Sequence, residues 1–430
     1  MTLKTNKKFN LDYKWVILIL CFFMEFVCLG FCSSNGGLYT KAITEALGVK
    51  RSLYSLGSSL RYIVQVLVAM NFGTLVNKFG TKKMVFVGLA SLTGSVAIRA
   101  VASNLLHFYI SFALWGLGIV FSGGTMASTI VRRWFHQDVG RYTGLVMSAN
   151  GIGGAIAAQI ISPLINNGEV FGYRKAYVLS AVVSLVVSIV VLLFLRENPA
   201  DGPAVSADNG KKKPKGVQWV GIPYETARKK PYFYAIAALI FLTGISLQSV
   251  GAASLVHMAD IGINAGFIAT TATVFSLCLT FSKILVGVTY DKKGLRFALL
   301  MCLSAGLGCF LLCALMTNTS LGMGMAMTAR VIEALAVPLE TVIIPLLVSD
   351  LFGMASYNKV LGVFYAMNSL GLCLGSPLGD LCYDICGTYK PCFWIFSVLL
   401  FAVILGYLLV LRAAYKEKNK VLAELETTNA

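Results

Sequence analysis

A few charged side chains lie inside apolar stretches that are otherwise long enough to cross a lipid bilayer, and six of them are candidates for function. They are Glu25, Arg61, Lys283, Arg330, Glu333 and Glu340. A charge deep in hydrocarbon costs at least about 2.5–3.5 kcal/mol, so such a side chain normally faces a water-filled cavity or an opposite charge. Basic side chains in that setting can hold an anion, and carboxyl groups can carry a proton. Ion binding and proton transfer are therefore the chemistry that these residues offer.

Lys283 is the first candidate for an anion-binding residue. Thr273, Ser276, Thr280 and Lys283 follow one another at three- and four-residue steps, which places them on one face of a helix. This polar stripe predicts a helix that lines a cavity, with Ser276 and Thr280 beside Lys283 in a substrate site. The alternative is that Lys283, close to a helix end, reaches toward lipid headgroups.

Arg61 is a second cation, in the first half of the chain. Gln65 lies one helical turn away and Ser58 beside it. Together with Lys283, Arg61 would allow two halves of the protein to hold an anion between them. The competing interpretation is an ion pair between Arg61 and Glu25.

Arg330, Glu333 and Glu340 share one face of a single apolar run. The spacing of Arg330 and Glu333 favours a local ion pair, because residues three apart are neighbours on a helix. The other interpretation is that Glu333 or Glu25 carries a coupling proton, as Lys283 also could, since burial disfavours the charged form of an ionisable group.

Asn150 and Asn368 occupy equivalent places in two similar segments, GLVMSAN and GVFYAMN. Either side chain could donate a hydrogen bond to a substrate at the centre of the protein, and we include Asn368 among the substrate-binding candidates. A hydrogen bond between neighbouring helices is the plainer interpretation, particularly for Asn150.

The composition excludes a water-soluble protein. Of 430 residues, 57% are hydrophobic and 13% charged, and the mean hydropathy is +0.76, whereas soluble domains carry about 25% charged residues. The net charge of +17 comes from basic residues in short gaps between apolar runs, so we do not expect nucleic acid as a partner. Most of the 11 cysteines fall inside apolar runs. No disulfide framework, metal site or cofactor is predicted from them.

Twelve apolar runs predict a chain that crosses the membrane repeatedly as helices, since each run holds roughly the 20 residues that a crossing requires. The runs are 15–35, 52–76, 84–102, 106–131, 142–165, 174–195, 232–256, 265–289, 296–317, 320–349, 360–380 and 392–411. Arg196 to Lys230, rich in Pro and Lys, predicts a linker. Most Lys and Arg residues outside the runs fall on the side of both termini and this linker, which predicts that this side is cytoplasmic.

An internal repeat divides these helices into two sets. Gly73 to Lys83 returns in degraded form at Gly287 to Arg296, and Tyr173–Lys175 resembles Tyr389–Pro391. The Asn150 and Asn368 segments repeat at a similar separation, close to half the chain length. We predict an all-α integral membrane protein with six-helix bundles at 1–195 and 231–430, the second including a cytoplasmic tail, and a linker at 196–230.

The chain resembles the major facilitator superfamily of secondary transporters. The family signature between helices two and three corresponds here to Gly73, Leu75, Asn77, Gly80, Lys82 and Lys83. Asn77 replaces the acidic residue that the family prefers. The first half therefore lacks the negative charge that would hold this motif to the neighbouring helix. The second copy retains Asp291.

Several shorter segments are similar to the monocarboxylate transporter and oxalate/formate antiporter group. They are Arg133–Phe135 with Gly144, Gly172–Arg174, Lys230–Phe233 and Asp350–Gly353. The resemblance implies that a basic residue at the place of Lys283 holds the substrate carboxylate. Family members have arginine there, and this chain has lysine, which lacks the bidentate guanidinium fork.

We therefore expect a multi-pass transporter in the cell membrane, with both termini cytoplasmic, that moves a small organic monocarboxylate by alternating access with proton coupling. The alternative is export or exchange of another solute, such as a dicarboxylate, a drug or a sugar. A receptor would usually carry an appended cytoplasmic domain. An enzyme would need a nucleophile with a base partner or a metal-binding helix motif, and neither occurs. The expected partners are the anion, protons and lipid, and the oligomeric state is left open.

Overall fold

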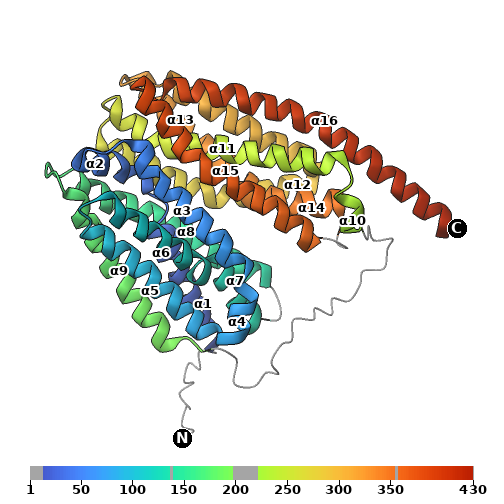
Figure 1. The fold of residues 1–430 in the computed structure, drawn as a ribbon, viewed down its shortest axis with the longest axis horizontal. Coiled ribbons are helices and arrows are strands. Elements are labelled where there is room, and N and C mark those ends of the chain that lie inside the picture. The colour runs from blue at the N-terminus through green and yellow to red at the C-terminus, as the bar shows by residue number, and fades with distance from the viewer. Residues whose placement is uncertain (1–12, 136–138, 197–220, 354–356, 430) are drawn as a thin grey trace, which may run out of the picture.

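The computed structural model describes residues 13–135, 139–196, 221–353 and 357–429, and this part of the chain is helical throughout its regular structure (Figure 1). The helices are α1 (Tyr13–Glu25), η1 (Phe26–Phe31), α2 (Gly36–Leu47), α3 (Arg51–Met70), α4 (Phe72–Phe79), α5 (Thr81–Ala100), α6 (Leu105–Ser122), α7 (Gly124–Trp134), α8 (Val139–Ile165), α9 (Gly172–Phe194), α10 (Tyr224–Ala227), α11 (Pro231–Asp260), α12 (Ala265–Leu315), α13 (Ser320–Ala336), η2 (Leu339–Ile343), α14 (Ile344–Phe352), α15 (Tyr357–Cys386) and α16 (Lys390–Asn429). The two η elements are π-helical segments that continue a neighbouring α-helix.

Within the described residues, 11 helices are long and apolar enough to cross a membrane. One of them, α12, has 51 residues, and at about 1.5 Å per residue it is more than twice as long as a bilayer core is thick. Gly294, with φ 79°, interrupts its helical backbone. Dividing α12 at Gly294 produces the twelve crossings that the apolar runs predict, and the all-α membrane fold is confirmed.

The break in α12 matches a turn in the first half of the chain. Gly80 separates α4 from α5 with φ 86°, and Gly294 is its counterpart in the sequence repeat. A positive φ is strained for residues with a Cβ, so glycine is required at both places. The repeat therefore encodes the same turn twice.

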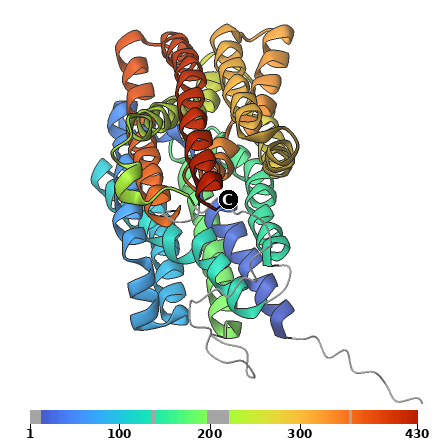
Figure 2. The ribbon, with the colours of Figure 1, turned by 90° about the vertical axis from the view of Figure 1, so that its right-hand side faces the viewer.

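The two sets of helices form two bundles that lie against each other (Figures 1 and 2). Elements α1 to α9 make one bundle and α11 to α16 the other. The main contacts between them are α3 with α15 and α8 with α12. Residues 197–220, most of the predicted linker, lie outside the described residues, and the domain division at 195 and 230 stays a proposal.

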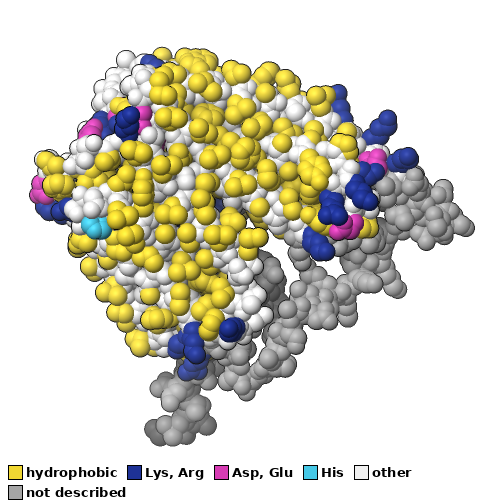
Figure 3. Space-filling model, viewed as in Figure 1, with side chains coloured by type: hydrophobic (Ala, Val, Ile, Leu, Met, Phe, Trp, Pro, Cys, Tyr) yellow, Lys and Arg dark blue, Asp and Glu magenta, His cyan; other side chains and the backbone are white. Residues whose placement is uncertain are grey.

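The bundles diverge toward the end of the molecule at which α1 begins and α16 ends (Figure 1). We call this end the inner end and the opposite one the outer end. Large apolar side chains cover the flanks, while Lys and Arg gather near the ends (Figure 3). Val186, Leu193 and Val398, for example, are 55%, 70% and 70% exposed. Such a surface is suited to a lipid environment.

Three elements were not predicted from the apolar runs. Helix α2 fills the gap between the first two crossings at the outer end, and α10 is a short turn before α11. Helix α16 continues beyond the predicted end at residue 411 to Asn429. Lys418 of this extension forms an ion pair with Asp350 at 2.7 Å, which fixes the extension to the end of α14.

Candidate functional site

A cavity of about 280 Å³ lies between the two bundles. Among its lining residues are Arg61 and Arg99 from the first bundle and Arg330, Glu333 and Glu340 from the second. Charged residues from both halves thus meet at one place. Lys283, the first sequence candidate, is not part of this lining.

Arg61 projects from α3 onto aromatic rings. Its guanidinium carbon lies 4.6 Å from the ring centroid of Trp115 and 4.2 Å from that of Tyr62. The Nε of Arg61 is buried and has no hydrogen-bond partner. The described residues show no ion pair between Arg61 and Glu25, contrary to one of the two interpretations. Arg61 lines the central cavity, and its role as a substrate ligand stays a prediction.

Arg99 was missed by the sequence analysis. It lies in the last turn of α5, is 3% exposed, and its Nε donates a hydrogen bond to Ser111 at 2.5 Å. The rings of Phe112, Trp115 and Tyr177 surround the guanidinium at 4.4, 4.4 and 5.8 Å, and its Nη2 has no partner. From the sequence Arg99 looks like a residue at a helix end, because the predicted apolar run ends at residue 102.

Arg330 and Glu333 form the ion pair that their spacing predicts. Arg330 also donates to the hydroxyl of Ser254 at 3.0 Å and lies over the ring of Phe275. Both members are buried, at 3% and 7% exposure. Glu333 is therefore a paired carboxylate in this conformation, although it remains among the proposed proton carriers.

Glu340 lies in the π-helical segment η2, seven residues beyond Glu333. Its side chain lines the cavity. Within the described part of the chain, neither a hydrogen bond nor an ion pair engages its carboxylate. π-Helical segments inside longer helices are common at functional sites, and this one places an unpaired carboxyl group in the cavity.

A second cavity, of about 810 Å³, lies nearer the inner end. Lys283 and Thr280 of α12 line it, facing Asn150 of α8 and Trp15 of α1. Glu25, which is 1% exposed, is close enough to Lys283 for their charges to interact. Lys283 thus lines a cavity whose lining also includes the exposed side chains of Leu145 and Ile284. Its neighbour is a carboxyl group rather than a second cation, and its role as a substrate ligand stays a prediction.

Thr273 and Ser276, which begin the polar stripe on α12, pack against α8. The hydroxyl of Thr273 donates to the carbonyl of Ala155 at 3.1 Å and accepts from Gln159 at 2.9 Å. Ser276 is 3% exposed and touches Gly154. The stripe therefore faces two environments, and only Thr280 and Lys283 line the second cavity.

The two equivalent asparagines lie in different surroundings. Asn150 accepts a hydrogen bond from Ser34, in the turn between η1 and α2, at 3.0 Å, and it also lines the second cavity. Asn368 is 5% exposed, with an unpartnered Oδ1 close to Gly244. Asn368 lines neither of the two cavities, and its role as a substrate ligand stays a prediction.

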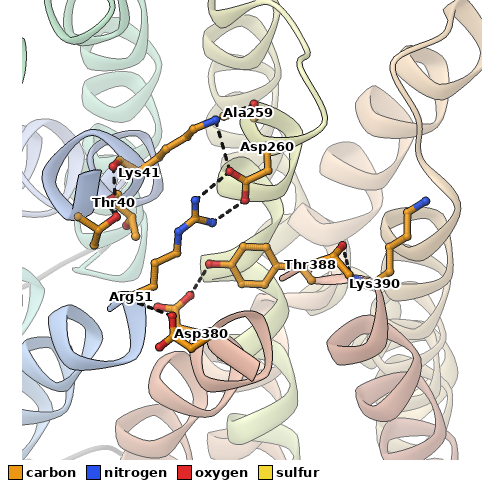
Figure 4. Close-up of polar contacts among 11 residues, drawn as sticks. Thr40, Lys41, Arg51, Ala259, Asp260, Asp380, Thr388 and Lys390 are labelled. Atoms are coloured by element: carbon orange, nitrogen blue, oxygen red, sulfur yellow. Dashed lines mark hydrogen bonds and ion pairs between the residues drawn. The ribbon is translucent and has the colours of Figure 1, made fainter. Parts of the chain in front are cut away.

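At the outer end, polar contacts join the two bundles (Figure 4). Both terminal nitrogens of Arg51 bind Asp260, at 2.5 and 2.8 Å, and Lys41 lies 3.4 Å from the same carboxylate. Ser55 donates to Asp380, which also accepts from Tyr389 at 2.5 Å. These contacts close the central cavity on this side.

The start of α3 is also held by the opposite bundle. The backbone nitrogens of Arg51 and Ser52 donate to the carboxylate of Asp384 at 3.3 and 3.0 Å. A helix N-terminus has unsatisfied N–H groups and a partial positive charge, so a carboxylate there is stabilising. Asp384 belongs to α15, so this helix cap crosses between the bundles.

At the inner end the corresponding helix surfaces are open. A Cβ built at Gly144 of α8 or at Gly362 of α15 would meet nothing within 4 Å. Gly73 and Gly287, in the two copies of the sequence motif, are equally uncrowded. The bundles are joined by polar contacts at the outer end and diverge toward the inner end (Figure 1).

The signature residues lie at this open end. Asn77, Lys82 and Lys83 are exposed, and Gly80 forms the turn described above. Arg133 donates a hydrogen bond to the hydroxyl of Thr81, and this contact joins the motif to the end of α7. Asp291 is exposed as well. The structural motif role of these residues is otherwise not tested by the geometry.

The described residues show no group of three or more His, Cys, Asp or Glu side chains that could hold a metal ion. All 11 cysteines are described, and each is a free thiol.

Several characterised transporters are similar in sequence. Monocarboxylate transporter 13 of Rattus norvegicus is 22% identical over 394 residues, covering 90% of this chain and 86% of that protein. The oxalate:formate antiporter of Oxalobacter formigenes is 21% identical and covers 86% and 85%. The sialic acid transporter NanX of Escherichia coli (strain K12) is 22% identical over 266 residues, 60% of each chain.

Solved transporter structures share the fold. A variant of the nucleoside transporter NupG superposes with a TM-score of 0.75 at 14% identity, covering 93% of this chain and 100% of that one. A bacterial homolog of the human lysosomal transporter Spinster, in an inward-facing and unoccupied conformation, gives 0.72 at 14%, covering 95% and 98%. At this identity the likeness extends to the fold alone.

The sequence model of the Major Facilitator Superfamily matches residues 17–253 and 236–428. These two matches span both bundles, and they agree with the repeated turn and the twelve crossings. The resemblance to monocarboxylate transporters noted from short motifs is also found over whole chains. The chain belongs to the Major Facilitator Superfamily and is a membrane transporter rather than an enzyme.

Proposed function

We propose that this transporter carries a small organic monocarboxylate across the cell membrane by alternating access, with proton coupling. The inner end would face the cytoplasm, because the basic residues outside the apolar runs concentrate there. Both termini would then be cytoplasmic. The relatives that bear monocarboxylate or oxalate:formate in their names support an organic anion as the substrate class.

The observation that carries this proposal is the presence, in the cavity between the bundles, of two arginines that have no carboxylate partner among the described residues. Of the three arginines that line the central cavity, only Arg330 has a carboxylate partner, while Arg61 and Arg99 contact aromatic rings. A buried cation without a counter-ion is costly. A bound carboxylate would relieve this cost and favour closure of the bundles around it.

Lys283 and Glu25 are the proposed coupling pair. Both lie near the inner cavity, beside the path that a solute would take from the central cavity to the inner end. Lys283, with Thr280, would meet the anion there, and Glu25 would hold or release the proton as that anion arrives. If the empty carrier returns with the pair one proton poorer, one proton travels with each anion and transport is electroneutral.

The test is uptake by the purified full-length protein in lipid vesicles. Pyruvate, lactate, formate and oxalate would compete for uptake of labelled pyruvate, with and without an imposed pH gradient. We expect competition by the monocarboxylates and accumulation driven by an acidic exterior. Lys283→Gln should reduce flux at least about tenfold, and Lys283→Arg should impair pH-driven accumulation more than binding.

Three outcomes would count against the proposal. Flux that is unaffected in the Lys283→Gln variant would remove Lys283 from the mechanism. Accumulation that does not depend on the pH gradient would show that transport is not coupled to protons. Competition by a sugar or a drug in place of the carboxylates would favour the alternative substrate classes.

A further inference from the structure

The wall of the central cavity that belongs to the first bundle offers hydrogen-bond donors without acceptors. Arg61 Nε, Arg99 Nη2 and the indole Nε1 of Trp115 are all buried and unpaired, and all three residues line the cavity. Unmade hydrogen bonds of buried donors cost free energy, more so for charged groups. Three such donors around one indole ring indicate a place for an anionic group.

Aromatic rings, rather than carboxylates, hold these arginines in position. The guanidinium carbons of Arg61 and Arg99 lie 4.6 and 4.4 Å from the centroid of Trp115. Phe112 adds a second ring beside Arg99, and Ser111 fixes its Nε. Cation–π contacts orient a guanidinium without neutralising it. The full charge of both groups thus stays available to a ligand.

The wall that belongs to the second bundle offers a hydrogen-bond acceptor instead of donors. Arg330 is neutralised by Glu333, and Asp380 already accepts hydrogen bonds from Ser55 and Tyr389. Glu340 remains, with an acceptor carboxylate that no described side chain engages. The second bundle therefore presents a half-buried carboxylate without a protein partner to the same cavity in which the first bundle has buried, unpaired donors.

We propose that the central cavity binds an acid with two polar ends: a carboxylate held by Arg99, Arg61 and Trp115, and a hydroxyl or ammonium group that donates a hydrogen bond to Glu340. This inference rests on the proposed transport of a carboxylate and adds the second group and its position. One such molecule bridges the two bundles, because its ends bind α5, α3 and α6 on one side and η2 on the other. Dicarboxylates are excluded because a second anion would face Glu340.

The volume of about 280 Å³ is at the small end of ligand cavities. Acids with a chain of four carbons are small enough for a cavity of this volume and serve as probes. Butyrate, 4-hydroxybutyrate, 4-aminobutyrate and succinate share this length and differ only in the group at the far end. Comparing the hydroxyl with the ammonium compound shows which donor the site prefers.

The experiment measures inhibition of labelled 4-hydroxybutyrate uptake by each of the four acids in vesicles that contain the full-length protein. We expect 4-hydroxybutyrate or 4-aminobutyrate to bind at least about tenfold more tightly than butyrate, which is the usual worth of a hydrogen bond to a charged group. Succinate should be the weakest inhibitor.

Two variants test the two ends of the proposed site separately. In Glu340→Gln the preference for the donor-bearing acid over butyrate should fall to about twofold or less, with butyrate affinity retained. In Arg99→Gln all four acids should lose affinity together, because the shared carboxylate loses its partner. Glu169→Gln, on an exposed loop far from the cavity, is the matched control and should keep both preference and affinity.

The results distinguish this inference from the proposed function. Equal inhibition by butyrate and 4-hydroxybutyrate in the unmodified protein would overturn the two-ended site and leave carboxylate transport standing. A preference that survives in Glu340→Gln would also overturn it. Absence of inhibition by every carboxylate, including pyruvate and formate, would overturn the proposed function and this inference with it.

Discussion

The outer and inner ends of the same helices differ in how the two bundles meet. At the outer end, Arg51 binds Asp260 in a bidentate pair and Asp384 caps α3. At the inner end, glycines at 144 and 362 face open space. Specific polar contacts hold the bundles together at the outer end, whereas the inner end has glycines without contacts on its helix surfaces.

Glycines show the same contrast along single helices. On α8, a Cβ at Gly151 would lie 2.3 Å from the Thr280 hydroxyl and 2.5 Å from the Ser276 carbonyl, while one at Gly144 would touch nothing. On α15, Gly371 and Gly375 are crowded by α11, and Gly362 is not. Glycines allow helix backbones to approach closely in lipid. We infer that the open glycines are the surfaces that meet when the inner end closes.

The largest effect is expected from breaking the outer ion pair. Asp260→Ala leaves Arg51, whose side chain is 7% exposed, without its counter-charge, and loss of one member of a buried pair costs about 3–5 kcal/mol. The closed outer end should then open more often. Faster amide hydrogen exchange over residues 51–59, together with reduced uptake, would show this.

Exchanging the charges, Arg51→Asp with Asp260→Arg, provides the control for that prediction. Partial recovery of uptake and of exchange protection is expected, because the attraction returns although the bidentate geometry does not. Unchanged exchange in Asp260→Ala would show that the polar contacts do not hold the outer end closed.

A moderate effect is expected from Gly151→Ala. The added methyl group collides with the backbone and hydroxyl of α12, and overpacking of this kind costs about 1–3 kcal/mol. The described conformation, with its outer end closed, should lose stability. A lower melting temperature in detergent would show this. A melting temperature equal to that of the unmodified protein would mean that α8 and α12 move apart without cost.

A more selective effect is expected from Gly144→Leu and Gly362→Leu. The described conformation has room for these side chains, so its melting temperature should stay the same. Closure of the inner end should suffer, and uptake should fall by about tenfold if the leucine costs the usual 1–3 kcal/mol of overpacking. Normal uptake by both variants would separate these glycines from the closing surface.

The smallest effect is expected at the exposed pair Glu169 and Lys175, which lies outside both cavities. The hydrogen bond from Lys175 holds the pKa of Glu169 below its usual value. Such a group stabilises the fold above the ordinary carboxyl pKa and loses that contribution as the pH falls through the lowered value. Because the pair is solvent-screened, Glu169→Gln should alter neither uptake nor its pH profile between pH 5 and 8.

A changed uptake profile in Glu169→Gln would indicate that the outer loops take part in coupling, and the contrast between outer and inner ends would need revision. The same variant serves as the control for the cavity substitutions.

Residue patterns predicted the membrane fold because hydrophobic length is a local property. Each apolar run had to become a helix, since no other backbone satisfies its hydrogen bonds in lipid. The repeat placed Gly80 and Gly294 at equivalent positions, and the structure has a turn with positive φ at each of them. The pair formed by Arg330 and Glu333 was predicted because its members are three residues apart on one helix.

Other site features depend on segments far apart in the chain. Arg99 looks like a residue at a helix end until α6 and α9 place rings around it. Arg61 was expected either at the cavity or beside Glu25, and only the packing of Trp115 decided between them. The contacts of Asp260 and Asp384 with α3 were not predicted, because α3 begins more than 200 residues earlier in the chain.

The sequence by itself determined the number of crossings, the repeat and the sign of the charges available for binding, because these depend on composition and local spacing. Tertiary structure decided which of those charges are paired and which line a shared cavity. The reason is that the burial of a charge, and hence its need for a ligand, is set by side chains from several helices at once.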